Sequence, residues 1–255
     1  MEKIISINNL SIAFNKYTEV VKNVNIDVVK GKTTAIVGES GSGKTLSALS
    51  ILKLLPNGAN IKTGEIKYKN KNLLNLSQKE IQNIRGNNIS TIFQEPMTSL
   101  NPLHTINKQI EEIITTHNTI SKKEAKKRTI KLLNEVGLNN ISSRPKIYPY
   151  ELSGGQRQRA MIAMSIANEP DLLIADEPTT ALDVTIQLQI LELLQNIQRK
   201  MGMSLIFISH DLSVVKKLSD YIYVMKDGKI IEFGTSEKIF NNPKNKYTKE
   251  LVSNQ

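Results

Sequence analysis

The sequence predicts an α/β protein in which a strand-rich core is interrupted by a helical segment. Short apolar runs rich in β-branched residues recur near both ends of the chain, whereas helical periodicity fills the stretch from about residue 97 to residue 166. A glycine-rich octapeptide, residues 38–45, stands between one apolar run and a helical pattern. We expect a single domain over residues 1–255, with a core formed by 1–96 and 167–255 and a helical subdomain over 97–166.

The strands of the core are predicted from alternating or β-branched content. Before the helical segment they are expected at residues 4–7, 24–28, 34–37, 66–68 and 89–93. After it, buried strands are predicted at 171–175 and 205–209, with a helix over 184–200 between them. Two further strands, 221–225 and 229–233, are separated by the turn-forming pair Asp227-Gly228.

The helical segment is predicted from the spacing of its apolar residues. Isoleucines at positions 106, 110, 113 and 114 are three or four residues apart, which places them on one face of a helix. Ile130, Leu133 and Val136 repeat with the same spacing.

Composition limits the classes of function. The chain has no cysteine, which excludes disulfides, thiolate metal sites and cysteine nucleophiles, and its apolar runs are far shorter than the ~20 residues that cross a bilayer. The net charge is +10, from 34 Lys and Arg against 24 Asp and Glu. Such a charge suits nucleic acid or an anionic surface, but the densest lysine cluster, residues 122–128, has no aromatic residues for base stacking. This pattern favours a solvated lysine-rich surface.

The octapeptide matches the phosphate-binding pattern G-x-x-x-x-G-K-[ST] at every position. Its glycines let the backbone curl so that N–H groups point at phosphate oxygens, and the following helix presents the positive end of its dipole to the same anion. Lys44 is expected to reach the β- and γ-phosphates and Thr45 to bind Mg²⁺. The predicted nucleotide-binding residues are Gly38, Glu39, Ser40, Gly41, Ser42, Gly43, Lys44 and Thr45.

A second motif is an apolar strand that ends in two carboxylates, Asp176 and Glu177. In α/β folds ligands bind at the carboxyl ends of the strands. Asp176 is expected to hold Mg²⁺, and Glu177 to polarise an attacking water as general base. The alternative is an acidic turn before Pro178, which the presence of the phosphate loop disfavours.

These motifs, with Leu152-Ser153-Gly154-Gly155-Gln156 between them, resemble those of an ABC-transporter ATPase subunit over the whole chain. The resemblance implies a RecA-like P-loop NTPase core with a β-subdomain and an inserted α-helical subdomain. It also implies ATP and Mg²⁺ as ligands and a second ATPase subunit as partner, because the signature segment binds ATP held by the opposing subunit.

Several residues take roles from this resemblance. Gln94 resembles the glutamine that contacts Mg²⁺ and the attacking water, and His210 the histidine that touches the γ-phosphate. Asp183 resembles an aspartate of the dimer interface, although it could simply cap the following helix. The signature residues Ser153, Gly154, Gly155 and Gln156 would bind the opposing γ-phosphate, although a lone Ser-Gly-Gly is also typical of a helix N-cap.

The adenine contact is expected from an aromatic residue upstream of the phosphate loop. ABC ATPases stack the base on such a ring. Phe14 is the predicted residue and Tyr17 the fallback, with a packing role for Phe14 as the alternative.

The segments at residues 93–102, 176–185 and 242–248 are similar to those of the peptide and nickel importer subfamily. The lack of a cysteine-bearing extension after Tyr247 favours nickel or a metal chelate over di- or oligopeptides as cargo. Implied partners are a related but distinct ATPase subunit, two permease subunits and an external solute-binding protein, with this chain peripheral at the cytoplasmic membrane face. The permeases are expected to dock near residues 97–105. The alternative function is a non-transport ABC ATPase acting on nucleic acid.

Overall fold

The computed structural model describes residues 1–15, 18–94, 99–180 and 182–253 of the chain. The chain divides into two compact units, one formed by Met1–Gln82 with Gly202–Gln255 and the other by Asn83–Met201. The expected helical segment, residues 97–166, lies within the second unit, and its predicted boundaries stay a prediction.

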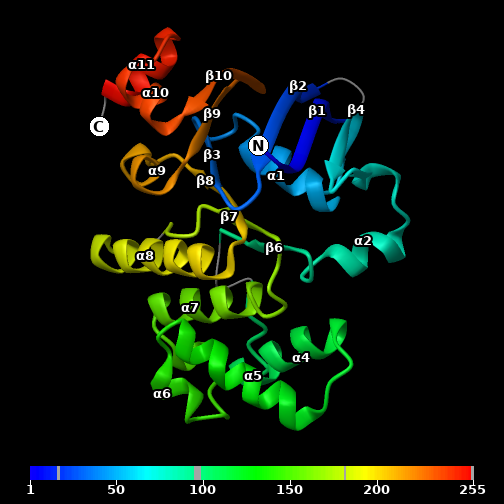
Figure 1. The fold of residues 1–255 in the computed structure, drawn as a ribbon, viewed down its shortest axis with the longest axis vertical. Helices are drawn as coiled ribbons and strands as arrows, with labels where there is room; N and C mark the ends of the chain where they lie inside the picture. The colour runs from blue at the N-terminus through cyan, green and yellow to red at the C-terminus, as the bar shows by residue number, and fades with distance from the viewer. Residues whose placement is uncertain (16–17, 95–98, 181, 254–255) are drawn as a thin grey trace. The chain divides into compact units, whose positions relative to one another are not determined.

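The first unit contains an antiparallel sheet in the order β2-β1-β4-β5. β1 (Lys3–Phe14) pairs with β2 (Thr18–Val29) on one side and β4 (Ala59–Tyr68) on the other, and Figure 1 shows the three side by side. β5 (Lys71–Asn72) is a short edge strand. The strands predicted at 4–7, 24–28 and 66–68 are confirmed within them. Each is longer than predicted, because cross-strand hydrogen bonds also hold polar residues that carry little apolar pattern.

The same unit contains a second run of strands in the order β10-β9-β3-β8. β3 (Thr33–Val37) is buried along its whole length and lies parallel to both β8 (Ser204–Ser209) and β9 (Tyr221–Lys226). β10 (Lys229–Thr235) returns antiparallel to β9. Asp227 and Gly228 in the connecting turn have φ of +49° and +81°, as the predicted two-residue hairpin turn requires.

Short helical elements complete the first unit. They are α1 (Lys44–Leu49), α9 (Leu212–Leu218), α10 (Ser236–Asn241) and α11 (Lys246–Ser253). Two 3-10 turns lie at Ser50–Leu52 and Leu73–Asn75. The helix α2 (Gln78–Ile84) starts in this unit, which ends at Gln82.

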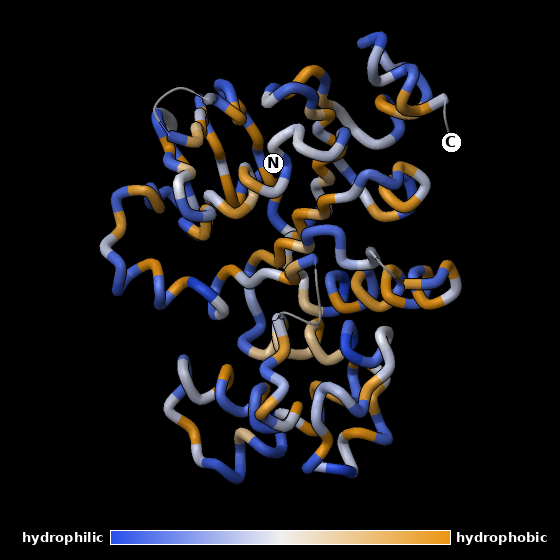
Figure 2. Tube along the Cα trace, turned by 180° about the vertical axis from the view of Figure 1, so that it is seen from behind, coloured by the Kyte–Doolittle hydropathy of each residue, from blue (hydrophilic) through white to orange (hydrophobic). Residues whose placement is uncertain are grey.

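The second unit joins a parallel strand pair to a set of helices. β6 (Ile89–Ile92) lies beside β7 (Leu172–Asp176). Hydrophobic and hydrophilic residues alternate around the helices (Figure 2), as half-buried helices require. The helices are α4 (Ile106–His117), α5 (Lys122–Glu135), α6 (Asn139–Ser142), α7 (Gly154–Ser165) and α8 (Val184–Met201), with a 3-10 turn at Pro149–Glu151.

The predicted helical periodicity is confirmed. Ile106, Ile110 and Ile114 are fully buried on α4, and Leu133 and Val136 are buried at the end of α5. Within the described residues, no helix is both long enough and apolar enough to span a membrane.

Glu232 on β10 anchors the segment that precedes α11. Its carboxylate oxygens accept hydrogen bonds from the backbone N–H groups of Lys244 and Asn245, at 2.8 and 3.0 Å. Burial acts to raise the pKa of Glu232, but these hydrogen bonds and the nearby Lys238 ammonium outweigh burial, so the pKa lies below its ordinary value of 4.5.

This lowered pKa predicts how Glu232 affects stability. A carboxyl with a lower pKa in the folded state stabilises the fold above its unfolded pKa and loses that effect as the pH falls through the folded pKa. At pH 7 we expect Glu232→Gln to lower the melting temperature by about 2–4 °C. The gap to wild type should shrink as the pH falls from about 5 to 3. Thermal unfolding followed by circular dichroism measures this.

Glu65→Gln is the matched control, because the Glu65 carboxylate makes an exposed ion pair with Lys67 at 2.9 Å. Exposed pairs contribute little to stability. A Glu232→Gln deficit that stayed constant between pH 7 and pH 3 would contradict the anchoring role.

Candidate functional site

The phosphate loop, residues 38–45, connects β3 to α1 and needs glycine for two different reasons. Gly38, Gly41 and Gly43 have positive φ values of +149°, +79° and +99°. Residues other than glycine rarely adopt a positive φ. A Cβ on Gly38 would lie 2.0 Å from the Met225 carbonyl oxygen, and one on Gly43 would lie 2.8 Å from the Met225 methyl. Nothing lies within 4 Å of the corresponding position on Gly41. The loop backbone therefore approaches the β9 backbone at Gly38, and at Gly43 it packs against the Met225 side chain.

Lys44 and Ser42 place buried polar groups in this loop. Lys44 is 6% exposed, and its Nζ donates to the carbonyl oxygens of Gly38 and Glu39 at 2.8 and 2.9 Å. The Ser42 hydroxyl is buried and makes no hydrogen bond to any described residue. A buried ammonium and an unsatisfied hydroxyl need an anionic or polar ligand to offset their desolvation. The loop therefore fits a phosphate group.

Asp176 and Glu177 follow β7 in the second unit. Asp176 is 4% exposed, and Glu177 adopts a φ of +45°, which is strained for a residue with a side chain. Glu177 Oε2 accepts hydrogen bonds from Gln94 Nε2 at 3.1 Å and from Thr180 Oγ1 at 3.0 Å. The structure thus brings together Gln94 and Glu177, which are 83 residues apart in sequence. The contribution of Thr180 has no counterpart in the sequence analysis.

The signature segment begins α7 in the same unit. Ser153 Oγ accepts from the Gln156 N–H at 3.3 Å, and Gln156 Oε1 accepts from the Ser153 N–H at 3.0 Å. This reciprocal pair is a capping box, so the N-cap that stood as the alternative for Ser153 is present. A Cβ on Gly155 would lie 2.8 Å from Cγ2 of Ile186, whereas one on Gly154 would be 3.6 Å from Leu182. Gly155 is therefore required by close packing against the start of α8.

Asp183 caps α8, as one of its two predicted roles requires. Its Oδ1 accepts from the Ile186 N–H at 3.0 Å. The dimer-interface role of Asp183 stays a prediction. Ala181, which belongs to the same motif, lies outside the described residues.

The adenine and γ-phosphate contacts also stay predictions. Phe14 ends β1 and is half-buried, and a Cβ on Gly58 would be in ordinary contact with its ring at 3.8 Å. Tyr17 lies outside the described residues. His210 follows β8 and is exposed, directly before Asp211, which caps α9.

The predicted Mg²⁺ ligands are oxygen donors of the kind that this ion prefers. Thr45 is an exposed hydroxyl in the first unit, and Gln94 and the buried Asp176 belong to the second. No group of three or more His, Asp or Glu side chains that could hold a metal occurs among the described residues.

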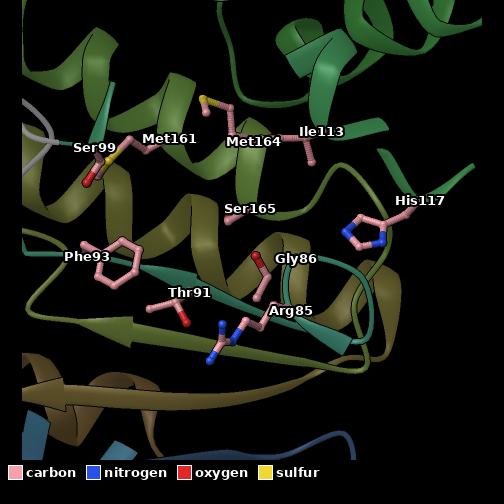
Figure 3. Close-up of a pocket in the computed structure, with 11 residues that line it drawn as sticks. Arg85, Gly86, Thr91, Phe93, Ser99, Ile113, His117, Met161, Met164 and Ser165 are labelled. Carbon is pink, nitrogen blue, oxygen red and sulfur yellow. The ribbon is translucent and has the colours of Figure 1, made fainter. Parts of the chain in front are cut away.

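A cavity of about 630 Å³ lies within the second unit, between β6 and helices α4 and α7. Figure 3 shows Phe93, Ser99 and Met161 at one end and Arg85 and His117 at the other. Phe93 is 43% exposed. The cavity therefore combines an apolar end with a polar, cationic end.

Comparison with known proteins identifies the family. The family model described as ABC transporter matches residues 21–180. The chain is 50% identical to the dipeptide transport ATP-binding protein DppD of Bacillus subtilis, covering 99% of this chain and 76% of that protein. It is 51% identical to the peptidoglycan transport ATP-binding protein YejF of Agrobacterium fabrum, across 99% of this chain but only 47% of that protein's length.

A solved dimeric ATP-binding cassette, in a post-hydrolysis state bound to ADP and phosphate, has a similar fold. It is 28% identical with a TM-score of 0.80, and the match covers 91% of this chain and 98% of that one. The predicted α/β fold class is thereby confirmed.

Gly38, which has a close backbone neighbour, and Gly41, which has none within 4 Å, should differ in how much an alanine substitution destabilises the fold. Gly38→Ala adds a clash with the Met225 backbone to an unfavourable φ, so we expect it to reduce the free energy of unfolding by about 2–5 kcal/mol. Gly41→Ala meets no neighbour, so its cost should be only that of the positive φ, about 1–2 kcal/mol. Urea unfolding of the two variants measures the difference. Equal losses would contradict the close approach at Gly38.

Proposed function

Because this chain belongs to the ABC transporter family as an ATP-binding protein that hydrolyses ATP, we propose that it energises the import of peptides through partner membrane subunits. The main observation in support of ATP hydrolysis is the hydrogen-bonded group at the end of β7. In this group Gln94 and Thr180 both donate to Glu177. A carboxylate held by two donors in a strained backbone is suited to a fixed catalytic task.

We assign the proton-accepting role to Glu177. Water attacks the γ-phosphorus of ATP, the bond from this phosphorus to the β–γ bridging oxygen breaks, and Glu177 takes the proton of the attacking water. Gln94 orients Glu177 and the water, and Lys44 and His210 offset negative charge on the phosphates. Thr45, Gln94 and Asp176 would hold Mg²⁺, which when bound neutralises charge on the phosphate oxygens.

The signature segment supports a role for two ATPase subunits. We propose that Ser153 and Gly155, at the positive end of α7, bind the γ-phosphate of ATP held by a related subunit. That a relative of similar fold was solved as a dimer with ADP and phosphate supports this assembly.

The cavity beside β6 is the proposed docking site for a permease. Ser99 and Phe93 lie at its apolar end, next to the stretch at 97–105 where docking is expected. Residues 97 and 98 themselves lie outside the described residues. Docking there would place the chain peripherally at the cytoplasmic face of the membrane, with an external solute-binding protein delivering the cargo.

The relatives favour peptides as cargo over nickel. One is named for dipeptide transport, another for oligopeptide transport and another for peptidoglycan transport. None of these names supports the prediction of nickel or a metal chelate as cargo. We propose no action on nucleic acid, and a filter-binding assay at physiological salt tests that alternative, since nonspecific charge binding fades there.

The general-base assignment predicts the behaviour of Glu177→Gln. The amide keeps the side chain's shape but cannot accept the proton, so ATP hydrolysis should slow by about 10²–10⁴-fold. ATP binding should persist, and with the partner ATPase present the variant should form a complex in sedimentation. A colorimetric phosphate assay measures the rate.

Glu192→Gln is the control for this variant, because it changes an equivalent carboxylate on α8 away from the motif. Glu177→Gln hydrolysis within threefold of wild type would contradict the assignment of the base. Monomers alone in ATP, with both ATPase subunits present, would contradict the paired assembly.

The cargo proposal predicts the outcome of an uptake experiment. Cells that lack this subunit should lose uptake of a labelled dipeptide, and the wild-type chain but not Glu177→Gln should restore it. Uptake of radioactive nickel serves as the parallel measurement. Loss of nickel uptake with unchanged dipeptide uptake would overturn the peptide proposal and support the metal alternative.

A further inference from the structure

The segment at residues 242–248, here called the tail segment, has no role in the function proposed above. It runs from the end of α10 into the first turn of α11 in the first unit, and Figure 1 shows α10 beside β10 with α11 following it. Its side chain at position 247 contacts the phosphate loop. The Tyr247 hydroxyl accepts a hydrogen bond from the Glu39 N–H at 3.1 Å, across 208 residues of sequence.

The contact acts on the peptide group that holds Lys44. The Glu39 N–H and the Gly38 carbonyl belong to one planar peptide, and this carbonyl accepts from Lys44 Nζ at 2.8 Å. Rotation of that plane would break both hydrogen bonds together. That plane turns about the ψ of Gly38 and the φ of Glu39, and Gly38 has no side chain to restrict its ψ.

The tyrosine is itself held from three sides. Its ring is 8% exposed, and Lys226 Nζ lies 4.3 Å from the ring centroid. Its backbone N–H donates to Asn245 Oδ1 at 2.9 Å, and Glu232 accepts from the Lys244 and Asn245 N–H groups. Burial raises the pKa of Tyr247, and so does the Glu39 carboxylate, so the hydroxyl stays neutral at physiological pH.

We propose that Tyr247 is a positioning residue for ATP binding, which fixes the first peptide of the phosphate loop and through it the Lys44 ammonium. This rests on the proposed ATP-binding function of the loop. A change in the hydrogen bonds between the tail segment and Glu232 on β10 would then alter the position of the loop. No contact between Tyr247 and nucleotide is required.

Tyr247→Phe tests the proposal because it removes the hydroxyl and keeps the ring beneath Lys226. A single neutral hydrogen bond has a modest net effect, so we expect the dissociation constant for Mg·ATP to rise about three- to tenfold. In hydrolysis, KM should rise with it while kcat stays within about twofold, because Glu177 is unchanged. Isothermal titration calorimetry and a steady-state phosphate assay on the purified full chain measure these values.

Tyr223→Phe is a closely matched control. Tyr223 is 6% exposed in the same unit, and its hydroxyl bonds to Asp27 and not to the loop: it accepts from the Asp27 N–H at 3.0 Å and donates to the Asp27 carbonyl at 3.4 Å. Both variants lose a buried tyrosine hydroxyl bonded to a backbone N–H, so both should lower the melting temperature similarly. Only Tyr247→Phe should weaken ATP binding.

Glu232→Gln provides a second route, because it loosens the tail segment without touching the loop or the ring. It should also raise the dissociation constant for Mg·ATP, by a smaller factor. If Tyr247→Phe does not fold, Glu232→Gln replaces it as the test. ATP affinities of both tail variants equal to that of Tyr223→Phe would overturn the positioning role alone. A wild-type chain that binds no ATP would overturn the proposed function and this inference with it.

Discussion

Close approach between two backbones, that of the phosphate loop and that of the end of β9, is the constraint on which the first unit depends. With 2.0 Å between a hypothetical Gly38 Cβ and the Met225 oxygen, no side chain fits there. The hairpin that follows reinforces the contact, because the Gly228 N–H donates to the Ser42 carbonyl at 3.2 Å. The loop is therefore shaped from outside by β9 and its turn, and from inside by Lys44.

In the second unit, side chains rather than a close backbone approach fix the position of a site residue. Glu177 must be held in one orientation although it follows a strand end, where chains are ordinarily least restrained. Gln94, which follows β6, and Thr180, in the turn after β7, converge on one oxygen of that carboxylate. Because β6 and β7 are paired in parallel, their carboxyl ends meet at the same edge, and the pairing itself brings Gln94 to Glu177.

The sequence predicted best what is local. The glycine-rich turn before α1 and the hairpin turn at Asp227-Gly228 depend on neighbours a few residues away, and both are where they were expected. The caps at Ser153 and Asp183, which stood as alternatives to functional roles, are also present. The bonds from Gln94 to Glu177 and from Tyr247 to Glu39 join residues 83 and 208 apart, and no spacing rule encodes such pairs. In the sequence, Tyr247 stands out only as part of the subfamily motif at residues 242–248. Its packing on the loop depends on how α11 is attached to β10, which the sequence does not reveal.

Structural and ligand-binding roles need not compete for the same residue. A serine hydroxyl has one donor and two acceptor positions, and the capping box at Ser153 uses one acceptor for the Gln156 N–H. The cap therefore does not consume the donor that a phosphate oxygen would need. Likewise the α8 cap uses one carboxylate oxygen of Asp183 for the Ile186 N–H. Capping fixes each side chain's rotamer in advance, which reduces the entropy lost on binding a ligand. For both residues, the structural role alone therefore gives no argument against the functional one.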